Sequence, residues 1–115
     1  FAQASAYPEK PIRIINPFPP GSPVEFIGRQ VADRLSKAFG RPVLVESRAG
    51  AGGTIGANFV AKSAPDGYTL LVTTPSTIAV APSLYKSLPY DVTRDLVPIT
   101  ISVEAPAIMV ARTGP

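Results

Sequence analysis

Hydrophobic and polar residues alternate in blocks along this chain, and the spacing inside each block predicts its secondary structure. The β-branched run at residues 12–15, which Asn16 and Pro17 end, predicts a buried strand. From residue 24 to 39 the apolar residues recur every three or four positions with charged residues between them, which predicts an amphipathic helix. Gly40 follows as a natural stop for this helix.

Further along, the same succession of strand, loop and helix recurs. A glycine-rich stretch leads into a second helical segment at 55–61, which the Thr54 side chain can cap. A polar segment at 73–77 has hydroxyls placed to cap a short helix that runs toward Leu84. The remaining aliphatic and β-branched segments predict strands at residues 43–45, 68–72, 97–103 and 108–110.

The order of these elements predicts the fold class. Strand, loop and helix repeat three times, and strands that are hydrophobic on both faces are typical of an α/β domain with a mostly parallel sheet. Right-handed crossovers place the loops that follow the strands along one edge, where such sheets bind their ligands. These loops are the first loop (17–23), the glycine loop (47–53) and the third loop (73–77).

Composition narrows the chemistry that the chain can perform. Its 115 residues suit one ordinary domain, and a hydrophobic fraction of 45% argues against disorder. The sequence has no cysteine and no histidine, which excludes disulfides, a cysteine nucleophile, a Ser-His-Asp triad and a zinc site built on those residues. We therefore expect no metal and no cofactor.

Charge gives little indication of a partner. The 11 Lys and Arg residues exceed the 8 Asp and Glu residues by three, but they are scattered and interleaved with acids. Nucleic-acid binding needs a clustered basic stripe, often with stacking aromatics, so we expect no nucleic-acid partner. No apolar run approaches the roughly 18 residues that span a bilayer.

The first residues contain the pattern that signal peptidase cuts behind. Ala2-Gln3-Ala4 is an A-x-A sequence, and residues 1–6 are therefore interpreted as a signal-peptide remnant with the mature protein starting near Ser5. The alternative is that A-x-A arises by chance in an alanine-rich chain.

The glycine loop does not carry a nucleotide-binding motif. Gly50, Gly52, Gly53 and Gly56 miss the G-x-G-x-x-G spacing because residue 55 is Ile. No Lys-Ser or Lys-Thr pair follows the loop, so the phosphate-binding P-loop motif is missing as well.

The first and third loops suit an anion better. Gly21 lets the backbone approach a ligand closely. Ser22 and the amides at the start of the following helix can point at an anion, aided by the helix dipole, and Ser76 and Thr77 can do the same from the third loop. The alternative is that these hydroxyls only cap their helices, with Glu25 complementing the dipole.

The other candidate catalytic groups favour structural roles. Asp91 and Asp95 stand four residues apart, where like charges on a helix repel, and are interpreted as capping or solvated residues. The four tyrosines are interpreted as packing residues. Because no base is placed to activate a nucleophile, we expect no enzyme. A small hydrolase that uses Ser76 is the competing hypothesis.

Six stretches of the chain resemble one known family. In order along the sequence they are YPEKPIR (7–13), PFPPG (17–21), GRPV (40–43), SRAGAGGTIG (47–56), APDGYTLL (64–71) and LPYD (88–91), with Asp95 after the last. They are similar to the extracytoplasmic solute receptors of tripartite tricarboxylate transporters, the Bug family.

The resemblance implies a periplasmic protein that captures a small carboxylate and delivers it to the membrane permease subunits of a transporter. It also implies a fold of two α/β lobes of the type II periplasmic-binding-protein kind, three layers each, that close on the ligand. The ligand-binding residues carried over to this sequence are Phe18, Pro20, Gly21, Ser22, Ser76, Thr77 and Ala105.

Two features depart from the family pattern. The family commonly has Gly-Gly in the first loop and an Asp four residues after the first Gly, whereas this chain has Gly21-Ser22 and Glu25. The chain is also much shorter than a family member. We therefore expect one lobe at residues 7–106, the start of the crossover to a missing second lobe at 107–115, and an apolar interlobe face exposed to self-association. A truncated interaction module without a ligand is the alternative function.

Overall fold

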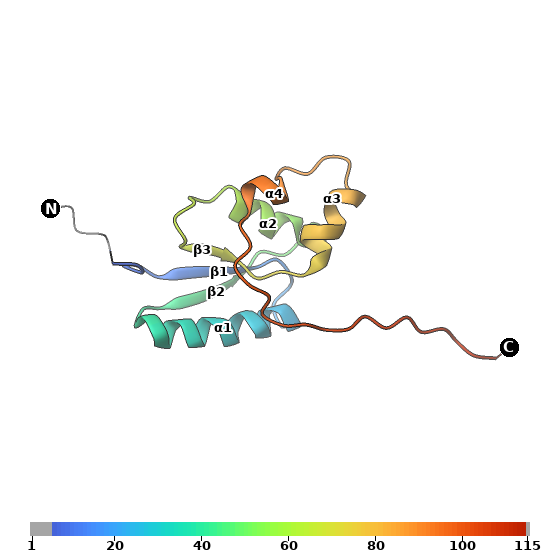
Figure 1. Ribbon diagram of the computed structural model, residues 1–115, viewed down its shortest axis with the longest axis horizontal. Coiled ribbons are helices and arrows are strands. Elements are labelled where there is room, and N and C mark those ends of the chain that lie inside the picture. The colour runs from blue at the N-terminus through green and yellow to red at the C-terminus, as the bar shows by residue number, and fades with distance from the viewer. Residues whose placement is uncertain (1–5, 115) are drawn as a thin grey trace.

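The computed structural model describes residues 6–114, in which three parallel strands carry helices on both faces (Figure 1). The signal-peptide interpretation rests on residues that lie mostly outside this range. The strands are β1 (Ile12–Asn16), β2 (Val43–Ser47) and β3 (Thr69–Leu71). The helices are α1 (Pro23–Phe39), α2 (Thr54–Ala61), α3 (Ala81–Leu84) and α4 (Val92–Asp95), with a 3₁₀ turn η1 (Ala51–Gly53) and a wide π-type turn η2 (Ser76–Val80).

The sheet has the order β2-β1-β3, which confirms the prediction of a parallel α/β arrangement. Ile14 of the central strand stands opposite Val45 of β2 and Leu70 of β3. Because β1 is paired on both sides, its aliphatic side chains form the centre of the core: Ile12 and Ile15 are fully buried and Ile14 is 3% exposed.

The two long helices cover opposite faces of the sheet. A methyl group built on Gly28 of α1 would lie 3.2 Å from Val72 and 3.9 Å from Ile14, so α1 packs closely on the face to which Ile14 points. Arg13, whose side chain points to the other face by strand alternation, lies 5.2 Å from the ring centre of Phe59 in α2. Because the three strands are parallel, the loops that follow them lie together at one edge of the sheet.

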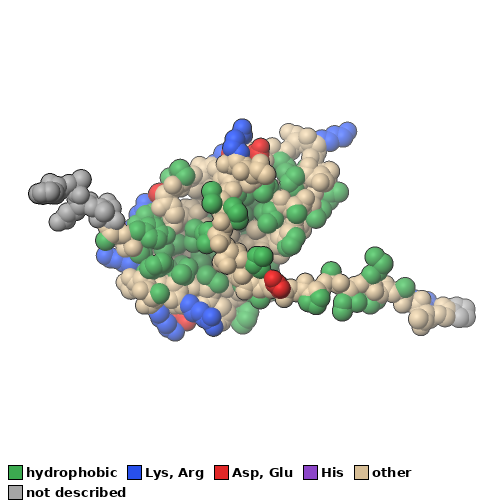
Figure 2. All heavy atoms as spheres, in the orientation of Figure 1, with side chains coloured by type: hydrophobic (Ala, Val, Ile, Leu, Met, Phe, Trp, Pro, Cys, Tyr) green, Lys and Arg blue, Asp and Glu red, His purple; other side chains and the backbone are tan. Residues whose placement is uncertain are grey.

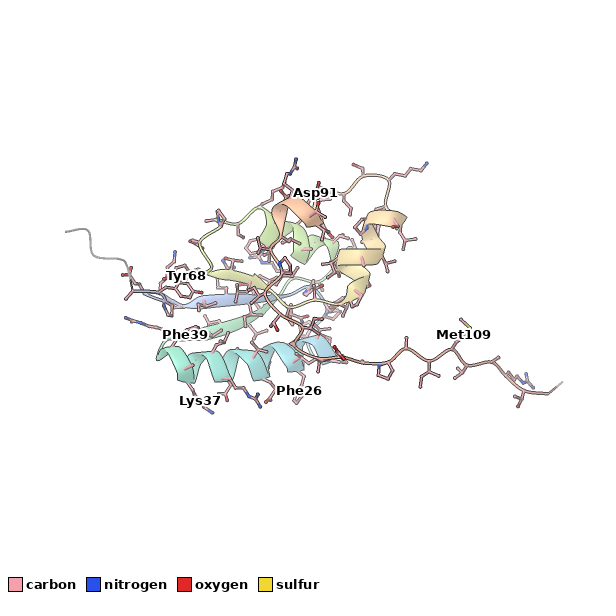
Figure 3. All side chains as sticks on the ribbon, viewed as in Figure 1. Phe26, Lys37, Phe39, Tyr68, Asp91 and Met109 are labelled. Atoms are coloured by element: carbon pink, nitrogen blue, oxygen red, sulfur yellow. The ribbon has the colours of Figure 1, made fainter. Side chains whose placement is uncertain are left out.

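The predicted end of the first helix is confirmed, and its start lies one residue earlier than predicted, at Pro23. Ser22 caps α1 at its beginning, and Gly40 ends it in the left-handed conformation with φ of 64° while its N–H donates to the carbonyl of Ser36. Phe39 and Tyr68 lie at the opposite edge of the sheet from the loops (Figure 3). The Tyr7 ring packs on both, with ring centres 6.0 and 5.0 Å away. These two tyrosines have the packing role that the sequence predicts.

The predicted cap of the second helix is wrong by one residue. Gly53, in the left-handed region with φ of 92°, is the N-cap of α2, and Thr54 is the first helical residue. The Thr54 hydroxyl donates to the carbonyl of Ala51 instead of accepting from the helix. The short helix toward Leu84 is present, but its first turn is η2, and no side chain caps it.

The predicted strands at 97–103 and 108–110 do not form. Residues 96–114 run as an extended segment without regular structure, and this segment leaves the packed elements (Figure 1). Ile99 and Ile101 are 75% and 76% exposed, and Met109 at 98% extends into solvent (Figure 3). An alternating pattern makes a strand only where a neighbouring strand supplies its backbone hydrogen bonds. The lobe boundary at residue 106 stays a prediction, since the exposed segment passes through it unchanged.

Candidate functional site

Three loops meet at the carboxyl edge of the sheet. A methyl group built on Gly53 would lie 2.5 Å from the hydroxyl oxygen of Thr77 and 3.5 Å from the Phe18 ring, so the glycine loop touches both other loops. The Thr77 hydroxyl also donates to the carbonyl of Gly52 over 3.3 Å. A methyl group on Gly56 would come within 2.8 Å of Pro17. The closeness of these contacts explains why glycines occupy positions 53 and 56.

Asn16, the last residue of β1, holds the loops from beneath. It is fully buried, and the two hydrogens of its amide are shared among three acceptors: the Phe18 carbonyl and the Ser47 hydroxyl, each at 3.0 Å, and the Ser22 hydroxyl at 3.3 Å. Its side-chain oxygen accepts from the Phe18 N–H at 3.2 Å. Sequence reasoning used Asn16 only as a strand end. A polar residue that ends an otherwise apolar central strand is the signal that could have found it.

The start of α1 is capped by its own side chains. The Ser22 hydroxyl accepts from the Glu25 N–H at 3.2 Å, while the Glu25 carboxylate accepts from the Gly21 N–H and from the Arg29 guanidinium. The Gly21 N–H, and then Arg29, hold the pKa of Glu25 below its ordinary value. Ser22 and Glu25 therefore both cap the start of α1, and the prediction that Ser22 also contacts a ligand stays a prediction. The S-x-x-E sequence from Ser22 to Glu25 is the local signal for this arrangement.

The structure brings six of the seven predicted ligand-binding residues to the loop edge but leaves them in different environments. Pro20, Gly21 and Ser76 are exposed, Phe18 and Ser22 are half-buried, and Thr77 is fully buried with its hydroxyl committed to Gly52. The Ser76 hydroxyl pairs with that of Thr74. Ala105 lies in the exposed segment, and within residues 6–114 no hydrogen bond joins it to the loops.

The acids and tyrosines around this edge have structural roles. Asp91 caps α4 (Figure 3) by accepting from the N–H groups of Thr93 and Arg94, and Asp95 accepts from the Asp91 N–H. Tyr90 is 5% exposed and donates to the Thr77 carbonyl at 3.1 Å, and burial raises the pKa of its phenol. No group of three acidic residues that could hold a metal ion occurs within residues 6–114.

Two hollows of the molecular surface lie beside the helices that follow the glycine loop and the third loop. One of about 600 Å³ lies between the η2–α3 segment and α4, with Tyr85, Leu88 and Tyr90 in its wall. Another of about 740 Å³ lies beside α2, where the Arg48 guanidinium stacks 3.6 Å from the ring centre of Phe59. None of the seven predicted ligand-binding residues lines either hollow. Arg48, in the glycine loop, lies in the wall of the second hollow. No helix within residues 6–114 is long and apolar enough to cross a membrane.

Comparison with known proteins gives consistent matches. Residues 27–114 match the sequence profile of the tripartite tricarboxylate transporter family receptor. The chain is 47% identical to protein BugT of Bordetella pertussis over 108 residues. This alignment covers 93% of this chain and 33% of that protein. It thus spans about a third of the length of the curated relatives it matches.

Solved structures share the fold. The periplasmic binding protein BugD is similar with a TM-score of 0.73 and 39% identity, over 77% of this chain and 29% of that one. MatC from Rhodopseudomonas palustris with bound malate gives a TM-score of 0.73 at 35% identity, over 77% and 30% of the two chains. A further R. palustris protein, in a structure with adipate, gives a TM-score of 0.72 at 32% identity, over 76% of this chain and 29% of that one.

Proposed function

Since this chain belongs to the tripartite tricarboxylate transporter receptor family, whose members are binding receptors and not enzymes, we propose that it takes part in capturing a small carboxylate for uptake. The capture takes place outside the cytoplasm, and the ligand passes to the membrane permease subunits of a tripartite transporter. The periplasmic relatives support this location.

The observation that carries the proposal is the match to two structures described with malate and with adipate. Both molecules are dicarboxylates, and both matches extend over about three quarters of this chain. In open α/β sheets ligands bind at the carboxyl ends of the strands, which is the edge where the three loops meet. The ligand-contacting residues that we propose are Phe18, Pro20, Gly21, Ser22, Ser76, Thr77 and Ala105.

The exposure of Pro20, Gly21 and Ser76 supports a second part of the proposal, that this chain forms one of two walls. Ligand sites favour the interface between domains, and the chain spans about a third of its relatives' length. Residues 7–106 then form one lobe and residues 107–115 begin the passage to another. On this hypothesis residues 1–115 alone bind carboxylates weakly.

Isothermal calorimetry tests both parts with a panel of mono- and dicarboxylates. Two proteins are compared. One is residues 1–115 alone, and the other, the longer protein, is this chain together with any sequence that adjoins it in its gene. We expect binding by the longer protein, weakened by Ser76→Ala and unaffected by Ser83→Ala, a matched change at an exposed position of α3. Sub-micromolar binding by residues 1–115 would refute the two-wall hypothesis. The absence of binding to any carboxylate by either protein would refute the receptor function.

Exposed apolar side chains favour one additional interaction, the association of two copies of this chain. Leu84 is 73% exposed, and Ile99 and Ile101 are 75% and 76% exposed. Figure 2 shows hydrophobic side chains along the extended segment that leads to the C-terminus. Surfaces of this kind favour contact with another protein surface. Sedimentation of residues 1–115 at rising concentration should show dimers. The double variant Ile99→Ser, Ile101→Ser should form a smaller fraction of dimers. A strictly monomeric profile at high concentration contradicts this hypothesis.

A further inference from the structure

The strand β3 ends the sheet with an open edge. The Tyr68 carbonyl accepts from β1, and the Val72 N–H donates to the Ile15 carbonyl at 3.1 Å. The backbone groups of successive strand residues point to opposite sides, so Thr69 and Leu71 direct their N–H and C=O groups away from β1. The sheet order β2-β1-β3 places no strand on that side within residues 6–114. These backbone groups are therefore available to another strand.

The edge at β3 also lacks the protection that sheet edges usually have. Charged side chains commonly prevent an exposed edge from pairing with another chain. The opposite edge strand, β2, carries Glu46 in ion pairs with Arg13 and Arg48, whereas β3 has the uncharged sequence Thr-Leu-Leu. Just beyond β3, the buried hydroxyl of Thr73 has no hydrogen-bond partner within residues 6–114. Buried polar groups normally have a partner, so these features favour a further strand beside β3.

The same chain contains a segment with the pattern of a strand and no neighbour. Residues 97–103 are extended and exposed, and no backbone hydrogen bond joins them to the rest of residues 6–114. Their apolar side chains share one face, as in a half-buried strand: Val97, Ile99, Ile101 and Val103. In its own copy this segment leaves the packed elements (Figure 1). One molecule thus has an open edge and an unpaired segment that suits such an edge.

Pro98 determines which side of this segment can pair. Proline has no N–H group and is accommodated on the side of an edge strand that faces solvent. Thr100 directs its backbone groups to the same side as Pro98, because alternate residues of a strand point the same way. Ile99 and Ile101 present their N–H and C=O groups on the other side, where no proline interrupts them. That side matches the open edge of β3.

We propose that residues 97–103 of one copy add to the β3 edge of a second copy as a fourth strand. The exchange is reciprocal, because each copy has one open edge and one unpaired segment. A dimer with two-fold symmetry therefore satisfies both edges at once. Backbone hydrogen bonds supply the affinity, as in other complexes that form by strand addition. This inference specifies the association of two copies proposed above and does not depend on the carboxylate-receptor function.

Amide hydrogen exchange of residues 1–115, followed by NMR at low and high protein concentration, tests the strand exchange. The Thr69 and Leu71 amides should exchange more slowly, by about tenfold or more, where sedimentation shows dimers. Leu70 is the internal control, because its N–H faces β1 and is protected at both concentrations. Dimers with unprotected Thr69 and Leu71 amides would overturn the strand exchange and leave association through apolar side chains standing. A monomer at every concentration contradicts both.

Cross-linking identifies the copy that supplies the strand, because the chain has no cysteine of its own. A short bismaleimide should join Thr69→Cys protein to Thr100→Cys protein in a mixture of the two. Lys37→Cys, on the outer side of α1 (Figure 3), replaces Thr69→Cys in the control mixture and should give far less of the mixed product. In the double variant Thr69→Cys, Thr100→Cys, a monomer linked internally would show pairing within one copy and refute the proposal.

Proline variants test the backbone hydrogen bonds themselves. Ile101→Pro removes an N–H from the pairing side, and Ile101→Ala loses the same side chain but keeps that N–H. The Kd of the dimer, measured by sedimentation, should be about tenfold higher for Ile101→Pro than for Ile101→Ala. Thr100→Pro, on the solvent side, should leave the Kd within about twofold of the unmodified value. Equal Kd values for the two Ile101 variants would exclude a β-ladder between the copies.

Discussion

A single methyl group added at Gly53 tests whether the three loops form one packed unit. Gly53 lies in the left-handed region, where any other residue is strained, and its position for a Cβ lies 2.5 Å from the hydroxyl oxygen of the fully buried Thr77. A contact of that length forces Thr77 to move, and its hydrogen bond to the Gly52 carbonyl is then broken.

The expected loss of stability has three parts. Left-handed strain for alanine costs about 1–2 kcal/mol, which the smaller entropy of the unfolded chain offsets by about 0.4–1 kcal/mol. Breaking the Thr77 hydrogen bond adds about 1 kcal/mol, and crowding in a packed region adds about 1–3 kcal/mol. The net destabilisation for Gly53→Ala is therefore about 3 kcal/mol.

Gly40→Ala is the matched control. Gly40 also has a left-handed backbone, but no atom lies within 4 Å of its Cβ position, so this variant has the strain without the contact. Urea unfolding followed by circular dichroism should give about 2 kcal/mol less stability for Gly53→Ala than for Gly40→Ala. Thr77→Ala combined with Gly53→Ala should cost less than the sum of the two changes, because the obstructing hydroxyl is gone. Equal losses at positions 53 and 40 would show that the loops are not in contact.

Three further predictions concern the residues beneath the first loop. Asn16→Ala should lower the free energy of unfolding by about 2–3 kcal/mol, because it leaves several half-buried partners unpaired. A loss below half of that in urea titration would contradict the role of Asn16 as the loop support. Ser22→Ala should cost about 1 kcal/mol through the lost cap of α1, and an unchanged urea midpoint would argue against the cap. The pKa of Glu25 is lowered in the folded state from its ordinary 4.5, so its ionised form stabilises the fold above that pH and this contribution is lost as the pH falls below it. The urea midpoint of Glu25→Gln should consequently fall less steeply below pH 4.5 than that of the unmodified protein, and parallel curves would refute the assignment.

Much of the candidate site could be predicted from short stretches of sequence. The features that could not be predicted depend on contacts between residues far apart in the chain. The positions of the first and third loops follow from where the strands end, and the cap at Ser22 follows from residues three positions apart. Thr77 and Ser76 are neighbours with hydroxyl side chains, yet one is fully buried on Gly52 and the other is exposed. Only packing against the glycine loop, 25 residues earlier, separates their roles.

The amino-acid sequence by itself determined the parallel α/β class, the span of the first helix and the loss of four N–H groups from the first loop, since these depend on side-chain type and spacing alone. Tertiary structure decided which loops share hydrogen bonds. The Asn16 amide donates to the Ser47 hydroxyl and the Thr77 hydroxyl donates to the Gly52 carbonyl because the sheet brings these distant segments together. The alternating residues 97–103 stay extended because no strand within residues 6–114 lies beside them. Hydrogen bonds need a partner in space, and a partner's position is a property of the whole fold.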